Sequence, residues 1–148
     1  LDVTEFGKEL DESNTTLQQA IMAATGKDND NDSTATTIKW FRAPQGVMSP
    51  AMCQVLRDRQ IINVLGDCYC DDWAFAEKLG STKQLVAPLM LKQVQPGSIA
   101  IFHMPQRGFR ETTFYALEEF LEGLKERNLR CVTLSELMEH QHQQQTAP

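Results

Sequence analysis

The chain has 148 residues, of which 41% are hydrophobic, and its 14 basic and 20 acidic side chains give a net charge of −6. This length is enough for one domain with a buried core. The acidic balance argues against nucleic acid as a partner, and no apolar run reaches the roughly 18 residues of a membrane-spanning helix. Four cysteines are too few for a disulfide scaffold, so we expect free or structural thiols.

Hydrophobic spacing and capping residues predict helices that alternate with strands. Helices are expected over 2–25, from Ser49-Pro50 to about Gln60, over 82–93, over 111–126, and in a short closing segment from Ser135. Strands are expected over 38–42, from Ile61 through Tyr69, over 98–102, and over 130–134. This order is typical of a parallel α/β sheet or barrel. Four strands are too few to close a barrel, so a small open sheet and the later part of a larger barrel both remain possible.

Apolar residues at helical spacing also predict which helix faces are buried. For the helix over 111–126, the expected core stripe is Phe114, Leu117, Phe120, Leu121 and Leu124. In the helix over 82–93, Leu85, Leu89 and Lys92 recur at helical spacing, and in the helix over 2–25 one stripe is formed by Leu10, Leu17, Ile21 and Ala24.

Two segments are expected to lie outside this core. Residues 27–37 form a polar insertion with aspartates at alternate positions, as in a calcium-binding EF-hand loop. Ser33 stands where that loop needs glycine and Lys39 where it needs glutamate, so a solvated surface loop is expected instead. The Gln- and His-rich tail, 141–148, is expected to be disordered.

Three polar residues stand at or just after the ends of predicted strands, namely Arg42, Asp72 and His103. Each also has a non-functional interpretation: Arg42 as a surface ion-pair partner, Asp72 as a helix cap and His103 as a structural histidine. Parallel strands place their carboxyl ends on one side of a sheet, so the three side chains could share a cleft. An aspartate beside a histidine fixes its tautomer and favours the imidazolium, which can act as a general acid. No nucleophile elbow and no complete metal-ligand motif accompanies them.

Four segments resemble motifs of the polysaccharide deacetylases, the NodB-homology domain of carbohydrate esterase family 4. Segment 40–46 resembles the family's Phe-Arg-x-Pro-x-Gly motif, and 65–72 resembles a Leu-Gly-x-x-Tyr-x-x-Asp variant of its fourth motif. Segment 96–103 resembles its Pro-Gly-x-Ile-Ile-Leu-Leu-His strand, and 129–137 its closing Val-Thr-Leu-Ser-Glu-Leu strand. The match runs from about residue 5 to 138, so residues 1–140 are identified as a partial domain of this type.

The resemblance implies a distorted barrel of about seven parallel strands alternating with helices, of which this chain would hold the last four. It implies metal-dependent hydrolysis of acetyl groups on a polysaccharide such as chitin or peptidoglycan, with a divalent, zinc-like cofactor. His103 would be the general acid, Asp72 would tune it, and Arg42 would orient the catalytic base. Ile101 and Trp73 would contact substrate, Ile101 in the acetyl-methyl pocket. A polymeric substrate favours a secreted or cell-surface setting by analogy.

The sequence also departs from the family pattern. The Thr-Phe-Asp-Asp-Gly segment and the histidine motif, which carry the base and the metal ligands, are absent, so no metal ligand is assigned in this chain. Met104 replaces the usual aspartate after the histidine, and Gln45 replaces the usual aromatic residue. We therefore expect a fragment that lacks the early barrel strands, or else a non-catalytic carbohydrate-binding or vestigial domain. A fragment with open sheet edges is expected to aggregate or to need a partner. A flavodoxin-like phosphate-binding sheet is disfavoured, because no glycine-rich phosphate loop follows a strand.

Overall fold

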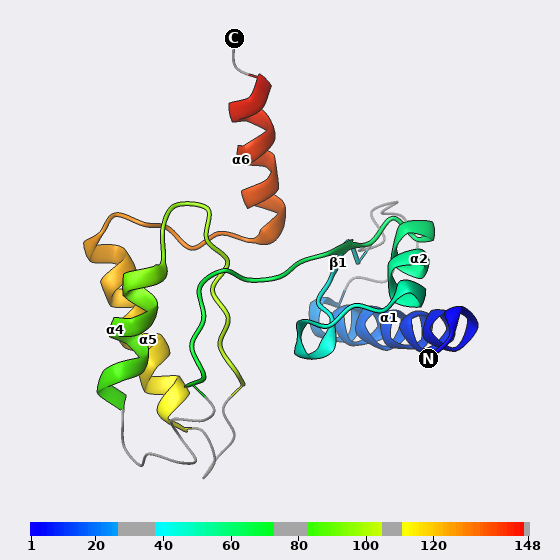
Figure 1. Cartoon of the computed structure of the whole chain (residues 1–148), viewed down its shortest axis with the longest axis horizontal. Coiled ribbons are helices and arrows are strands. Elements are labelled where there is room, and N and C mark those ends of the chain that lie inside the picture. Colours follow the sequence, from blue (N-terminus) through cyan, green and yellow to red (C-terminus); the bar gives the residue numbers. More distant parts are fainter. Residues whose placement is uncertain (27–37, 73–82, 105–110, 147–148) are drawn as a thin grey trace. The chain divides into compact units, whose positions relative to one another are not determined.

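The computed structural model describes residues 1–26, 38–72, 83–104 and 111–146. The chain divides into two compact units, 1–65 and 66–148, each described by itself below. The described residues are mostly helical, with one pair of short parallel strands (Figure 1). The expected α/β class is thus confirmed as a mixture of helices and parallel strands, but the described residues form no barrel. The expected insertion, 27–37, lies outside the described residues.

The first unit begins with helix α1, Val3–Thr25, which confirms the expected helix at this place. Asp2 caps its start, because its carboxylate accepts the backbone N–H of Glu5 at 2.9 Å. The Glu5 carboxylate accepts the Asp2 N–H at 3.0 Å in return, which completes a capping box. Gly26 ends the helix with a φ of 61°, a left-handed conformation that glycine adopts without strain.

Helix α1 packs against helix α2, Pro50–Asp58, which Ser49 caps as the sequence predicts. The core between them is formed by Phe6, Leu10, Val55, Leu56 and Ile61. Only the start of α1 contributes to it, because Leu17 and Ile21 are exposed. The expectation that these two residues face the core is therefore wrong.

The first unit also contains two short strands, β1, Trp40–Phe41, before α2, and β2, Ile62–Asn63, after it. They pair in parallel. The ring of Phe41 meets Phe6 edge-on, with 5.8 Å between the ring centroids, which joins β1 to the α1–α2 core. After β1, the short 3-10 helix η1, Pro44–Gly46, turns the chain toward α2. Both strands are shorter than expected from their apolar runs.

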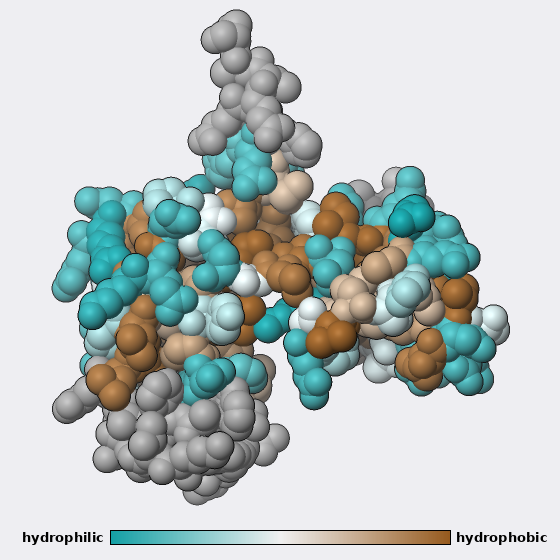
Figure 2. Space-filling model, viewed as in Figure 1, coloured by the Kyte–Doolittle hydropathy of each residue, from teal (hydrophilic) through white to brown (hydrophobic). Residues whose placement is uncertain are grey.

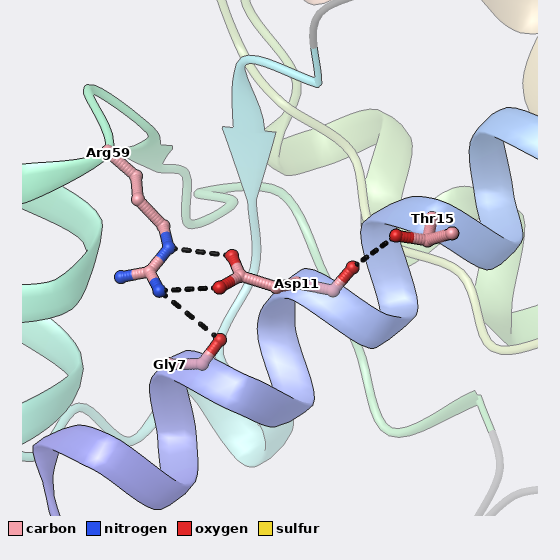
Figure 3. Close-up of polar contacts among 4 residues, drawn as sticks. All are labelled: Gly7, Asp11, Thr15 and Arg59. Carbon is pink, nitrogen blue, oxygen red and sulfur yellow. Dashed lines mark hydrogen bonds and ion pairs between the residues drawn. The ribbon is translucent and has the colours of Figure 1, made fainter.

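An exposed ion pair also joins α1 to the end of α2. The Arg59 guanidinium donates to both carboxylate oxygens of Asp11 at 2.7 Å and to the Gly7 carbonyl at 3.4 Å (Figure 3). This bidentate contact lowers the pKa of Asp11, mainly through the hydrogen bond from Arg59. A side chain at Gly7 would crowd Arg59, because a Cβ there would lie 3.0 Å from its terminal nitrogen.

The second unit is built around helices α4, Lys83–Gln93, and α5, Glu111–Glu126, which pack side by side (Figure 1). Their buried residues are Val86, Ala87, Met90, Thr113, Ala116, Phe120 and Leu124. Gly123 lets α4 come close, since a Cβ there would lie 2.5 Å from Leu91.

The buried face of α5 agrees with the expected stripe only in part, since Phe120 and Leu124 are buried as expected, and the buried face of α4 differs from the expected one. On α5, Phe114 is 63% exposed and Leu121 is 46% exposed, whereas the smaller Ala116 and Gly123 are buried. On α4, Leu85 and Leu89 are exposed. The physical reason is close approach, since two helices can pack most tightly where small residues face one another.

The expected fourth strand, 130–134, is not a strand in the structure. Thr133 instead caps helix α6, Leu134–Thr146, through a capping box in which its hydroxyl accepts the Glu136 N–H at 3.2 Å. The Glu136 carboxylate accepts the Thr133 N–H at 2.8 Å in return. Helix α6 also continues through the segment expected to be disordered, so that expectation for 141–148 is wrong as far as Thr146.

Apolar side chains remain on the surface of both units. On the drawn face, hydrophobic residues stand among hydrophilic ones over each unit (Figure 2). The large exposed ones include Val47, Ile62 and Leu65 in the first unit and Tyr69 and Phe114 in the second. Within the part of the chain that the structure describes, no helix is long and apolar enough to span a membrane, as expected.

Candidate acid–base site

Two extended segments of the second unit, 66–70 and 98–103, position the candidate site. They form a parallel bridge between Cys68 and Ala100. The Cys68 N–H donates to the Ile99 carbonyl at 3.3 Å, and the Ile101 N–H donates to the Cys68 carbonyl at 2.9 Å. Both segments therefore run the same way from the bridge, and each ends three or four residues later at a polar side chain, His103 or Asp72.

Gly66 allows the two segments to approach. A Cβ at this position would lie 2.5 Å from side-chain carbons of Ile101 and 2.6 Å from the Ile99 carbonyl oxygen. Both distances are too short for any real contact, and the carbonyl belongs to the backbone, which cannot move aside alone. Glycine at position 66 is thus a steric requirement of the bridge that leads to the site.

Asp67 holds the start of the 98–103 segment in place by hydrogen bonds. Its carboxylate accepts the Ile99 N–H at 2.7 Å and the Ser98 hydroxyl at 3.0 Å. The hydrogen bond from Ile99 is the largest influence and lowers the pKa of the Asp67 carboxyl; burial opposes it, and the Ser98 hydroxyl adds to the lowering. The carboxylate therefore fixes the register at the turn after Pro96-Gly97.

Asp72 is fully buried, and its carboxylate accepts three hydrogen bonds. Oδ1 lies 2.5 Å from Nδ1 of His103. Oδ2 accepts the backbone N–H of His103 at 3.0 Å and the hydroxyl of Thr113 at 2.9 Å. A buried carboxylate without such donors would be costly, and here each oxygen has at least one.

The contact with Asp72 gives the two ring nitrogens of His103 different surroundings. A carboxylate oxygen next to Nδ1 selects the ring form that carries a proton on Nδ1. The His103 side chain is 41% exposed, and no hydrogen bond within the described residues engages Nε2. The arrangement can therefore take up or release a proton at Nε2 while Nδ1 stays bonded to Asp72, which is the geometry of a general acid or base.

The structure thus brings together two of the three polar residues predicted at strand ends, Asp72 and His103. Arg42 is exposed in the first unit, where it lines a pocket of about 640 Å³ together with Trp40, Phe41 and Met48. Ile101 is half-buried, packs against Gly66 and lies two residues before His103. Trp73 lies outside the described residues.

Thr113 is the residue that sequence reasoning missed. It is 2% exposed on α5 and donates directly to Asp72. A signal for it exists in the sequence, because Thr113, Ala116, Phe120 and Gly123 recur at helical spacing on one face. This face shares Phe120 with the predicted stripe but extends it to smaller residues, which apolar spacing alone does not indicate.

Two cysteines lie next to the site and neither is activated. Burial raises the pKa of the Cys70 thiol to about 11, with a further contribution from the nearby Asp72 charge. Burial also raises the pKa of Cys68, which donates its thiol proton to the Met90 carbonyl at 3.3 Å. All four cysteines are free thiols, as expected, and Cys53 and Cys131 are exposed.

Among the described residues, no group of three histidine, cysteine, aspartate or glutamate side chains could hold the divalent metal that the resemblance implies. The comparisons with known proteins leave the family open, because the sequence matches no protein-family model and no curated protein.

Proposed function

We propose that the chain is part of a hydrolase of the polysaccharide deacetylase type, which removes acetyl groups from nitrogen on a polymer such as chitin or peptidoglycan. The observation that supports this most is the Asp72–His103 pair. A buried carboxylate holds one ring nitrogen, and the other nitrogen of a partly exposed imidazole is free to transfer a proton. The position of this pair at the ends of two parallel-bridged segments is what the motif resemblance leads one to expect.

In this proposal His103 donates the proton that amide cleavage requires. Water adds its oxygen to the acetyl carbon and gives its proton to a base. The carbon–nitrogen bond then breaks, and the leaving amine takes the proton from Nε2 of His103, so that acetate and a free amine are formed. An amine anion is too poor a leaving group to depart without that proton, which is why a general acid matters here.

The other residues take supporting roles in the proposal. Asp72 keeps Nδ1 protonated and the ring oriented, in the manner of the carboxylates that orient catalytic histidines elsewhere. Ile101 and Trp73 contact the acetylated sugar, and Arg42 orients the base. The base and the zinc-like metal belong to motifs that this sequence lacks, so we propose that they are supplied from outside this chain.

The test is acetate release from N-acetylated chitin oligosaccharides, with Zn²⁺ present, by the protein that contains this chain. Replacing His103 by glutamine should lower kcat/KM by roughly 10²–10⁴-fold, the usual contribution of a general acid. His140→Gln is the matched control, because His140 is exposed on α6, and it should leave the rate unchanged. Full activity in His103→Gln would overturn the acid role. Binding of the oligosaccharides without acetate release would instead assign a carbohydrate-binding domain.

A further inference from the structure

We infer that Thr113 is a positioning residue for His103, acting through Asp72; this inference rests on the function proposed above. Among the described donors to the Asp72 carboxylate, the Thr113 hydroxyl comes from α5, and the other two both belong to His103. Helix α5 is also held by packing, because Ala116 and Phe120 lie in the core shared with α4, and Phe120 meets the ring of Phe102. The hydroxyl of Thr113 therefore anchors the Asp72 carboxylate to helix α5, which is packed in the core.

The reason why a third donor matters is the orientation of the carboxylate plane. Without Thr113, the group could tilt about its Cβ–Cγ bond and lengthen the contact between Nδ1 of His103 and the carboxylate. The Thr113 hydroxyl, at 2.9 Å from Oδ2, restrains this tilt and keeps the other oxygen against Nδ1. The ring is then held in one tautomer, with Nε2 as its exchanging nitrogen.

A pair of near-isosteric variants separates the hydroxyl from the shape of the side chain. Thr113→Val keeps the volume and loses the hydroxyl, whereas Thr113→Ser keeps the hydroxyl and loses one methyl group. Thr16→Val is the matched control, since Thr16 is an exposed helical threonine whose hydroxyl bonds only to the Glu12 carbonyl.

The readout is the ¹⁵N NMR spectrum of the His103 ring in the 148-residue chain, at a pH where the ring is neutral. The wild type, Thr113→Ser and Thr16→Val should each show a protonated Nδ1 and an unprotonated Nε2. Thr113→Val should lose this pattern, and both nitrogens should move toward the averaged shifts of a tautomer mixture. An unchanged pattern in Thr113→Val would overturn the inference.

A second measurement, made on the wild type, tests the hydrogen bond from Thr113 to Asp72 even if Thr113→Val does not fold. In the wild type, the Thr113 hydroxyl proton should exchange slowly with water and show a nuclear Overhauser contact to the His103 amide proton. Exchange as fast as that of the Thr16 hydroxyl would overturn the inference. Neither measurement depends on deacetylase activity, so its failure is distinguishable from failure of the proposed function.

Discussion

His103 makes two hydrogen bonds to the same carboxylate, that of Asp72. Its backbone N–H donates to Oδ2 at 3.0 Å, and its ring Nδ1 lies 2.5 Å from Oδ1. One buried group therefore fixes both the end of the 98–103 segment and the orientation of the imidazole. The same carboxylate that stabilises the fold here also orients the ring.

Replacing Asp72 by asparagine should lower both stability and activity. The amide has one acceptor oxygen, so its NH2 group faces one of the three donors. Either that donor is left unsatisfied or the ring moves its proton to Nε2, and in both cases the hydrogen bonds to a charged group are lost, at a cost of roughly 1–3 kcal/mol. We expect a lower urea midpoint in circular dichroism and a loss of acetate release. Asp71→Asn is the control, because Asp71 is the exposed neighbour and should change stability by less than about 0.5 kcal/mol. Equal stability losses in the two variants would contradict the role of the buried carboxylate.

Replacing Gly66 by alanine should open the parallel bridge. The new methyl group would meet the Ile99 carbonyl and the Ile101 side chain, an overpacking that costs about 1–3 kcal/mol. The Ile101 amide proton, which donates to Cys68, should lose its protection in hydrogen exchange. Adding Ile101→Ala should not restore that protection, because the backbone contact remains. Wild-type protection of this proton in Gly66→Ala would show that the bridge tolerates a side chain.

The Asp67 carboxyl should make stability fall at acid pH. Its pKa lies below the ordinary 3.8 in the folded chain because Ile99 and Ser98 donate to the carboxylate. A carboxyl whose pKa is lower in the folded than in the unfolded chain stabilises the fold fully above its unfolded pKa, at about pH 4. This stabilisation is lost as the pH falls through the folded pKa, because the carboxyl is then protonated in both states. The destabilisation caused by Asp67→Asn should thus be constant near neutrality and shrink below that pH. A ¹³C titration midpoint for Asp67 at or above 3.8 would contradict this.

The cysteines should separate into two reactivity classes. At pH 8 a thiol with a pKa of about 11 holds roughly 100-fold less thiolate than one with the ordinary value of 9.0. We therefore expect iodoacetamide to label Cys53 and Cys131 first, and Cys68 and Cys70 only after unfolding in urea. Peptide mass spectrometry measures the labelling of each cysteine. Rapid labelling of Cys70 in the folded chain would contradict its burial.

Local signals in the sequence were enough to predict the helices. Asp2, Ser49 and Gly26 mark helix ends by hydrogen bonds or conformations that depend on the residue itself and its near neighbours. Strands depend on a partner segment that local patterns do not contain. This is why 38–42 is reduced to two strand residues, and why 130–134, with its strand-like composition, precedes a capping box instead.

Part of the candidate site could be predicted from the sequence. Asp72 and His103 could be paired because both follow apolar runs, and parallel register brings such ends together. Thr113 could not be placed from the site motifs, because it comes from a helix whose buried face was predicted from the spacing of its large apolar residues. Phe120 and Leu124 are buried as that spacing predicts, but the buried face also includes the small Ala116 and the polar Thr113.

The most direct test of His103 as a general acid compares two leaving groups. The acid role predicts that His103→Gln loses roughly 10²–10⁴-fold in kcat/KM on an N-acetylated sugar, whose amine needs a proton to leave. The same variant should keep near wild-type kcat/KM on an aryl acetate, whose phenolate leaves without one. Equal losses on both substrates would contradict proton donation by His103.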